Sequence, residues 1–120
     1  MKDILVIEDS EVETLYLKGL VDRIAEAEVS FVRSYKEGIK LCRMKRYDLI
    51  IADAIVSEGD AADFLTQVRN TGLNADTNAV VMGSDDDFEG GEYLDKTGYA
   101  NYITKPVKFN MLRAAILMYA

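Results

Sequence analysis

The sequence contains no histidine and only one cysteine among its 120 residues. Without imidazole side chains the chain has no histidine-ligated metal site, and it cannot carry a phosphoryl group on a histidine of its own. The single cysteine, Cys42, has no partner within the chain for a disulfide bond. Because proteins of oxidising compartments commonly carry paired cysteines, we expect a cytoplasmic location.

Other missing features disfavour four further classes of protein. No apolar run approaches the length of a membrane-spanning helix, and the first predicted strand begins directly after Lys2, so we expect neither a membrane association nor a signal peptide. The formal net charge of −7 disfavours direct binding of nucleic acid, which requires a basic surface. The pattern G-x-x-x-x-G-K is absent, which excludes a P-loop.

Apolar runs and helical patterns alternate five times without a linker or a repeat, which predicts a single α/β domain over residues 1–120. The runs are short and apolar throughout, as is typical of parallel strands buried on both faces. The predicted strands lie at about residues 3–7, 28–32, 48–52, 79–83 and 101–104. The predicted helices are one capped by Ser10 and ending near residue 25, one capped by Ser34, and three at about 62–70, 86–96 and 109–119. Gly90 and Gly91 interrupt the fourth helix, which we expect to be short or irregular.

Four of the predicted strands are followed by polar side chains that can do chemistry. These are Glu8 and Asp9 after the first strand, Asp53 after the third, Ser84 after the fourth and Lys105 after the fifth. In an open parallel sheet the ligand site lies beyond the carboxyl ends of the strands. We therefore expect carboxylates, a hydroxyl and an ammonium to meet at one edge of the sheet.

This set of groups suits a divalent cation and a phosphoryl group. Mg²⁺ prefers hard oxygen ligands, and a cation or the ammonium of Lys105 relieves the repulsion between crowded carboxylates. An aspartate so placed can also attack phosphorus. Each residue alone has a structural explanation, such as a helix cap, a turn residue or a surface lysine. All of them together at strand ends favour a functional site.

The chain resembles the receiver domains of two-component response regulators, including the chemotaxis regulators, over its whole length. The matching motifs are Ile7-Glu8-Asp9-Ser10, Tyr47-Asp48-Leu49-Ile50-Ile51-Ala52-Asp53, Val81-Met82-Gly83-Ser84 and Tyr102-Ile103-Thr104-Lys105-Pro106. The resemblance implies a flavodoxin-like, doubly wound fold with a five-stranded parallel sheet in the order 2-1-3-4-5 and helices on both faces. It implies that Asp53 accepts a phosphoryl group from a sensor histidine kinase or a phosphotransfer protein. Such a domain is not a turnover enzyme, since it catalyses only its own phosphorylation and dephosphorylation.

The resemblance also implies roles for individual residues. Asp9, Asp53 and the main-chain carbonyl of Ile55 would bind Mg²⁺, with Mn²⁺ able to substitute, and Glu8 would help through water. Ser84 and Lys105 would contact the phosphoryl oxygens, and the Lys105-Pro106 peptide bond would be cis.

Two residues would carry the response to phosphorylation. Ser84 would move toward the phosphoryl group while Tyr102 swings inward, which would change the face formed by the fourth helix, the fifth strand and the last helix. The alternative for Tyr102 is an edge-strand tyrosine that packs on a neighbour.

The chain departs from the family pattern at three positions. Ser57 stands where the family usually has proline, and Ala61 stands where it usually has glycine. Asp85 replaces the small residue that normally follows Ser84, and we hypothesise that its charge slows phosphorylation.

The last predicted helix is apolar nearly all round. It predicts either a homodimer through this helix or a covering segment that is missing from the sequence. Lys36, Lys40 and Arg43 share one side of the second helix, which indicates a solvated face more than a docking patch.

Three other functions remain as alternatives. A receiver that works without phosphorylation, as a protein-binding scaffold, is supported by Asp85 and by the altered loop at residues 57–61. A phosphatase of the haloacid dehalogenase kind needs a second aspartate two residues after the nucleophile, where this chain has Ile55. A flavodoxin-like cofactor binder needs a phosphate loop rich in hydroxyls and glycine, whereas residues 9–13 are acidic.

Overall fold

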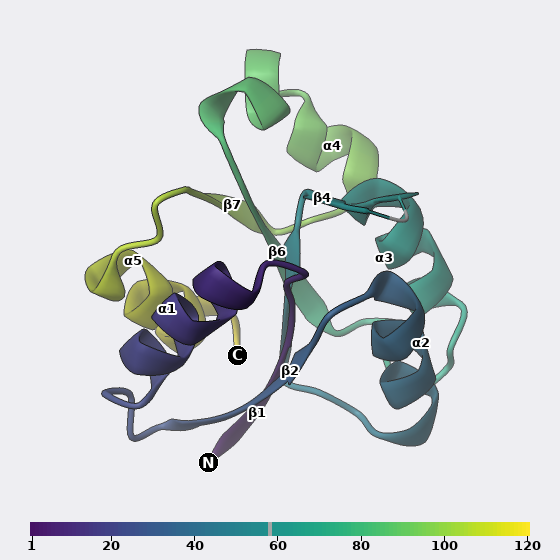
Figure 1. Cartoon of the computed structure of the whole chain (residues 1–120). Helices are drawn as coiled ribbons and strands as arrows, with labels where there is room; N and C mark the ends of the chain where they lie inside the picture. Colours follow the sequence, from purple (N-terminus) through teal and green to yellow (C-terminus); the bar gives the residue numbers. More distant parts are fainter. Residues whose placement is uncertain (58) are drawn as a thin grey trace.

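The core of the protein is a parallel sheet of five strands (Figure 1). The computed structural model describes residues 1–57 and 59–120. The strands are β1 (Lys2–Ile7), β2 (Ala27–Val32), β3 (Leu49–Asp53), β6 (Asn78–Gly83) and β7 (Asn101–Thr104), in the spatial order β2-β1-β3-β6-β7. Two short strands, β4 (Ile55–Val56) and β5 (Gly59–Asp60), pair with each other in antiparallel orientation. Leaving out that pair, the order is the predicted 2-1-3-4-5.

Helices cover both faces of the sheet, as predicted. They are α1 (Glu11–Val21), α2 (Tyr35–Met44), α3 (Ala61–Arg69), α4 (Tyr93–Thr97) and α5 (Phe109–Tyr119), together with a 3-10 helix, η1 (Asp85–Gly91). Figure 1 shows α1 and α5 on one side of the sheet and α2 and α3 on the other. Because side chains alternate along a strand, Ile4 and Val6 of β1 pack on the α1 and α5 side, while Leu5 and Ile7 pack on the α2 and α3 side.

Serine caps begin the first two helices where the sequence predicts them. The hydroxyl of Ser10 accepts a hydrogen bond from the Glu13 N–H at 3.2 Å, and that of Ser34 accepts from Glu37 at 3.1 Å. The predicted end of the first helix near residue 25 is wrong, because α1 ends at Val21. Ile24, which continues the apolar pattern, is buried from the following turn instead.

The fourth predicted helix is short and irregular, as predicted from its glycines. It consists of η1 and the five residues of α4, which ends at Gly98 with a φ of 86°. Left-handed backbone of this kind favours glycine. None of the helices formed by the described residues has the length and apolar character needed to cross a membrane.

Candidate functional site

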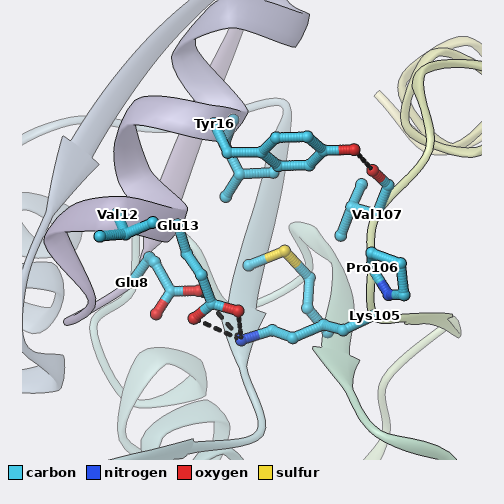
Figure 2. A pocket seen from close by; sticks show the side chains of 9 residues that line it. Glu8, Val12, Glu13, Tyr16, Lys105, Pro106 and Val107 are labelled. Atoms are coloured by element: carbon cyan, nitrogen blue, oxygen red, sulfur yellow. Dashed lines mark hydrogen bonds and ion pairs between the residues drawn. The ribbon is translucent and has the colours of Figure 1, made fainter.

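The carboxyl ends of β1, β3 and β7 and the first turn of α1 bring together an ammonium group and three carboxylates. Lys105 follows β7, and its N–H donates to the carbonyl of Gly83 at 2.8 Å, so the chain continues beside the end of β6. Its ammonium lies 2.9 Å from Asp53 Oδ2, 3.1 Å from Glu8 Oε1 and 3.0 Å from a carboxylate oxygen of Glu13. Figure 2 shows Lys105 reaching toward Glu8 and Glu13. The structure thus joins Glu8, Asp53 and Lys105, which the sequence predicts to meet.

Burial differs among these four groups. The side chain of Glu8 is 0% exposed and that of Asp53 is 9% exposed, whereas Lys105 is 23% and Glu13 is 42% exposed. Burial, and then a hydrogen bond with Asp53 and the charge of Asp53, raise the pKa of Glu8 to about 8. Burial works to lower the pKa of Lys105, but its hydrogen bonds to Asp53 and Glu13 outweigh that effect and raise it. Lys105 therefore stays charged, while Glu8 holds a proton more readily than an ordinary glutamate.

Main-chain groups and a tyrosine hold the buried carboxylates in place. The N–H of Ser10 donates to Glu8 Oε2 at 3.2 Å. The hydroxyl of Tyr35 donates to the carbonyl of Asp53 at 2.6 Å, and the N–H of Ala54 donates to the carbonyl of Met82 at 2.7 Å. These bonds tie the end of β3 to α2 and to β6, so the Asp53 carboxylate is attached to a rigid element.

Three carboxylates of this site fit a hard divalent cation. Glu8, Glu13 and Asp53 each offer an oxygen, and these oxygens lie within 4.8 Å of one another. Oxygen donors of this kind are what Mg²⁺ prefers. Asp9 is placed differently, since its Oδ2 accepts a hydrogen bond from the N–H of Ser57 at 3.0 Å. Ile55 lies in β4 with its side chain exposed, and metal binding by Asp9 and by the carbonyl of Ile55 stays a prediction.

Glu13 belongs to this site, and the sequence analysis did not include it. It lies in the first turn of α1, three residues after the Ser10 cap. The pattern Ser10-x-x-Glu13 suggests a capping box, in which Glu13 would accept from the N–H of Ser10. Glu8 accepts from that N–H instead, and the carboxylate of Glu13 turns to Lys105.

The predicted switch residues lie at the edge of the site. Asp87 Oδ2 accepts hydrogen bonds from the Ser84 hydroxyl at 3.0 Å and from the Ser84 N–H at 2.8 Å. Tyr102 is half-exposed on the edge strand β7, and its ring stacks on Phe88 with the centroids 4.6 Å apart. Both side chains are thus held by residues of η1, and their switching roles stay predictions.

An apolar cleft opens beside Glu8, Glu13 and Lys105 (Figure 2). It has a volume of about 280 Å³ and lies between α1 and the segment that joins β7 to α5. Its walls include Tyr16 and Val107, and the hydroxyl of Tyr16 donates to the Val107 carbonyl at 2.5 Å. The Lys105-Pro106 peptide bond is cis, as predicted.

Comparison with known proteins finds one family over nearly the whole chain. A family model described as the response regulator receiver domain matches residues 4–117. A probable C4-dicarboxylate response regulator of Priestia megaterium is 32% identical over 69% of this chain and 36% of its own length. Its counterpart in Bacillus subtilis strain 168 is 26% identical over 97% of this chain and 51% of its own length. The chain therefore spans about half, or less, of these relatives.

Solved structures share the fold at lower sequence identity. The chemotaxis response regulator CheY4 of Vibrio cholerae has a TM-score of 0.88 and 18% identity, covering 100% of this chain and 99% of its own. The receiver domain of the sensor histidine kinase PA1611 from Pseudomonas aeruginosa PAO1, solved with a magnesium ion coordinated in its active site cleft, has a TM-score of 0.86 and 18% identity, covering 98% of this chain and 96% of its own.

Proposed function

The chain belongs to the response regulator receiver domain family, and on that premise we propose that Asp53 is a phosphoacceptor. The donor would be the phosphohistidine of a sensor histidine kinase or a phosphotransfer protein, since this chain has no histidine. The observation that carries the proposal is the placement of Asp53, which ends β3 with its carboxylate 2.9 Å from the Lys105 ammonium and in contact with Glu8. We propose that residues 1–120 act as one receiver domain.

In the proposed reaction an oxygen of the Asp53 carboxylate attacks phosphorus. The bond between phosphorus and the donor imidazole breaks, and the imidazole nitrogen keeps the electron pair. Lys105 would shift one of its hydrogen bonds to a phosphoryl oxygen and stabilise the charge there. Glu8 and Asp53, with Asp9 and the main-chain carbonyl of Ile55, would hold Mg²⁺ or Mn²⁺, which would screen the phosphoryl charge when bound.

The response would then pass through Ser84 and Tyr102. Ser84 would leave Asp87 for a phosphoryl oxygen, and Tyr102 would leave Phe88 and turn inward, which would change the face made by α4, β7 and α5. Exposed Leu117 and Met118 on α5 support a homodimer through that helix. We propose neither a nucleic-acid contact nor a membrane contact for this domain, and a cytoplasmic location stays a prediction.

A second candidate function is a scaffold that binds partners without phosphorylation. The observation that favours it is the set of acidic residues around Ser84. Asp85 is exposed in the first turn of η1, and Asp87 engages the Ser84 hydroxyl. Both carboxylates would oppose an incoming phosphoryl group.

Chemical labelling separates the two functions. The protein would be incubated with Mg²⁺ and acetyl phosphate, and the modified peptide would be identified by mass spectrometry. The phosphoacceptor proposal expects one phosphoryl group on Asp53, loss of labelling in Asp53→Asn, and faster labelling in Asp85→Ala. An unlabelled protein that is folded and binds Mg²⁺ would favour the scaffold.

A further inference from the structure

Glu13 is the third partner of Lys105 and differs from the other two in its position. Glu8 and Asp53 stand at the ends of central strands, whereas Glu13 extends from the first turn of α1 (Figure 2). Its side chain is 42% exposed, against 0% for Glu8 and 9% for Asp53. A lysine ammonium has three N–H donors, and three carboxylates occupy them in this structure.

A phosphoryl group on Asp53 needs one of those donors. Lys105 then has to give up a partner, and the cost of losing the lysine depends on how well the released carboxylate can be solvated. The side chain of Glu8 is fully buried, while that of Glu13 is partly exposed to solvent. Glu13 also stands at a helix N-terminus, where a negative charge is favoured without a lysine. Of the two glutamates, Glu13 is therefore the one that leaves at the lower cost.

Resting on the proposed function, we propose that Glu13 is a positioning residue that competes with the phosphoryl group for Lys105. In the unphosphorylated protein it holds the ammonium beside Glu8 and Asp53. On phosphorylation its ion pair breaks and Lys105 turns to a phosphoryl oxygen. Glu13 thereby lowers the affinity of the site for the phosphoryl group.

The charge of Glu13 acts in opposite directions on the two ligands of the site. It lies within 4.8 Å of oxygens of Glu8 and Asp53, so it attracts a divalent cation bound between them. The same charge repels a phosphoryl group and withdraws Lys105 from it. Removing the charge should therefore weaken Mg²⁺ binding and strengthen phosphoryl binding. A merely structural residue would weaken both when it is replaced.

The test measures both affinities on the whole chain. Mg²⁺ would be titrated alone by calorimetry, and beryllofluoride, a phosphoryl mimic, would be titrated at saturating Mg²⁺ by NMR. Glu13→Gln should bind Mg²⁺ more weakly and beryllofluoride more tightly, each by about threefold to fivefold. Glu11→Gln is the matched control, because Glu11 is an exposed acidic residue of the same helical turn, and it should change neither affinity more than about twofold.

A second variant separates the ion pair from the charge alone. Glu13→Asp keeps the charge but is too short to hold Lys105, so it should bind Mg²⁺ nearly as the unaltered protein does and still bind beryllofluoride more tightly. If Glu13→Gln and Glu11→Gln bind beryllofluoride with the same affinity, the positioning role is overturned and the proposed function is not. Equal beryllofluoride affinities of Glu13→Asp and the unaltered protein would also overturn the positioning role. An unaltered protein with no response to beryllofluoride would overturn the proposed function as well.

Discussion

The two sides of the site are built in different ways. On one side, Glu8, Asp53 and Lys105 stand at the ends of strands of the main sheet and are joined by bonds of 2.9 to 3.1 Å. On the other side, Ser84 and Asp85 are exposed, and they lead into η1 and into α4, which has no fully buried residue. The comparison indicates that the ion pairs stand on a rigid sheet edge, whereas the proposed switch residue Ser84 leads toward a less deeply buried helix, α4. Five predictions test this division, in order of decreasing expected effect.

Replacing Lys105 should cause the largest loss of stability. Lys105→Met leaves Glu8, Glu13 and Asp53 without their shared cation, so the free energy of unfolding in metal-free buffer should fall by about 3 kcal/mol. Saturating Mg²⁺ should restore much of the loss, because a cation then replaces the ammonium. The measurement is urea unfolding with and without Mg²⁺.

Lys96→Met is the control for this variant. Lys96 pairs with Glu92 on the exposed surface of α4, and its loss should change stability by less than about 0.5 kcal/mol. Similar losses for the two lysine variants, or no recovery with Mg²⁺, would contradict the account of the rigid side.

The raised pKa of Glu8 predicts a pH dependence of Mg²⁺ binding. The cation displaces a proton from Glu8, so the apparent affinity should rise about tenfold per pH unit up to a pH of about 8 and level off above it. Calorimetric titrations at several pH values would measure this. Glu8→Gln should remove the slope, and a slope retained in that variant would assign the proton to another group.

The proton on Glu8 also affects the stability of the metal-free protein. The folded protein holds it more tightly than the unfolded chain, because the pKa rises from 4.5 to about 8 on folding. The stabilisation it contributes is therefore complete below pH 4.5 and is lost as the pH rises through about 8. Urea unfolding of Glu8→Gln in metal-free buffer should lack this decline.

Gly83 marks the junction between the two sides. A Cβ atom there would lie 2.6 Å from Asp87 Oδ2 and 2.9 Å from the Phe88 ring, so Gly83→Ala should destabilise the protein by about 2 kcal/mol. Thermal unfolding would measure the change. Gly19→Ala is the control, because outside its own helical turn no atom of the described residues lies within 4 Å of its added Cβ. Alanine also favours the helix interior, which predicts a gain of about 0.5 kcal/mol. A loss of stability in both variants would contradict a local clash at Gly83.

The smallest effect is expected at Asp87. Asp87→Asn replaces a charged acceptor of the Ser84 hydroxyl with a neutral one, which should release Ser84 and raise the beryllofluoride affinity about twofold. Asp86→Asn removes the same charge from an exposed neighbour and should have less effect. Equal effects of the two variants would assign the change to net charge and not to the hydrogen bond.

The rigid side of the molecule was largely predictable from the sequence. Unbroken apolar runs indicate buried strands. The polar residues after these strands meet because parallel strands end at one edge of the sheet. The bounds of β7 and α5 agree with the prediction. The caps at Ser10 and Ser34 were predictable, because a serine before a helix accepts a hydrogen bond from a free N–H of the first turn.

The remaining features depend on tertiary contacts that no local pattern encodes. Glu13 enters the site because its long side chain turns across to Lys105, while Glu8 takes over its capping bond. The first helix ends early although Ile24 continues its apolar period, because that side chain is buried from a turn. The strands β4 and β5 have two residues each, too few to show an alternating pattern.

The central claim is that the Asp53 carboxylate receives a phosphoryl group beside a divalent cation. The most direct test is a beryllofluoride titration of the protein, followed by NMR with Mg²⁺ present and absent. If Asp53 is the phosphoacceptor, the titration should give a saturable change that requires Mg²⁺, moves the resonances of Ser84 and Tyr102, and is lost in Asp53→Asn. An unchanged spectrum of the folded protein at saturating Mg²⁺, or a change that persists in Asp53→Asn, would contradict it.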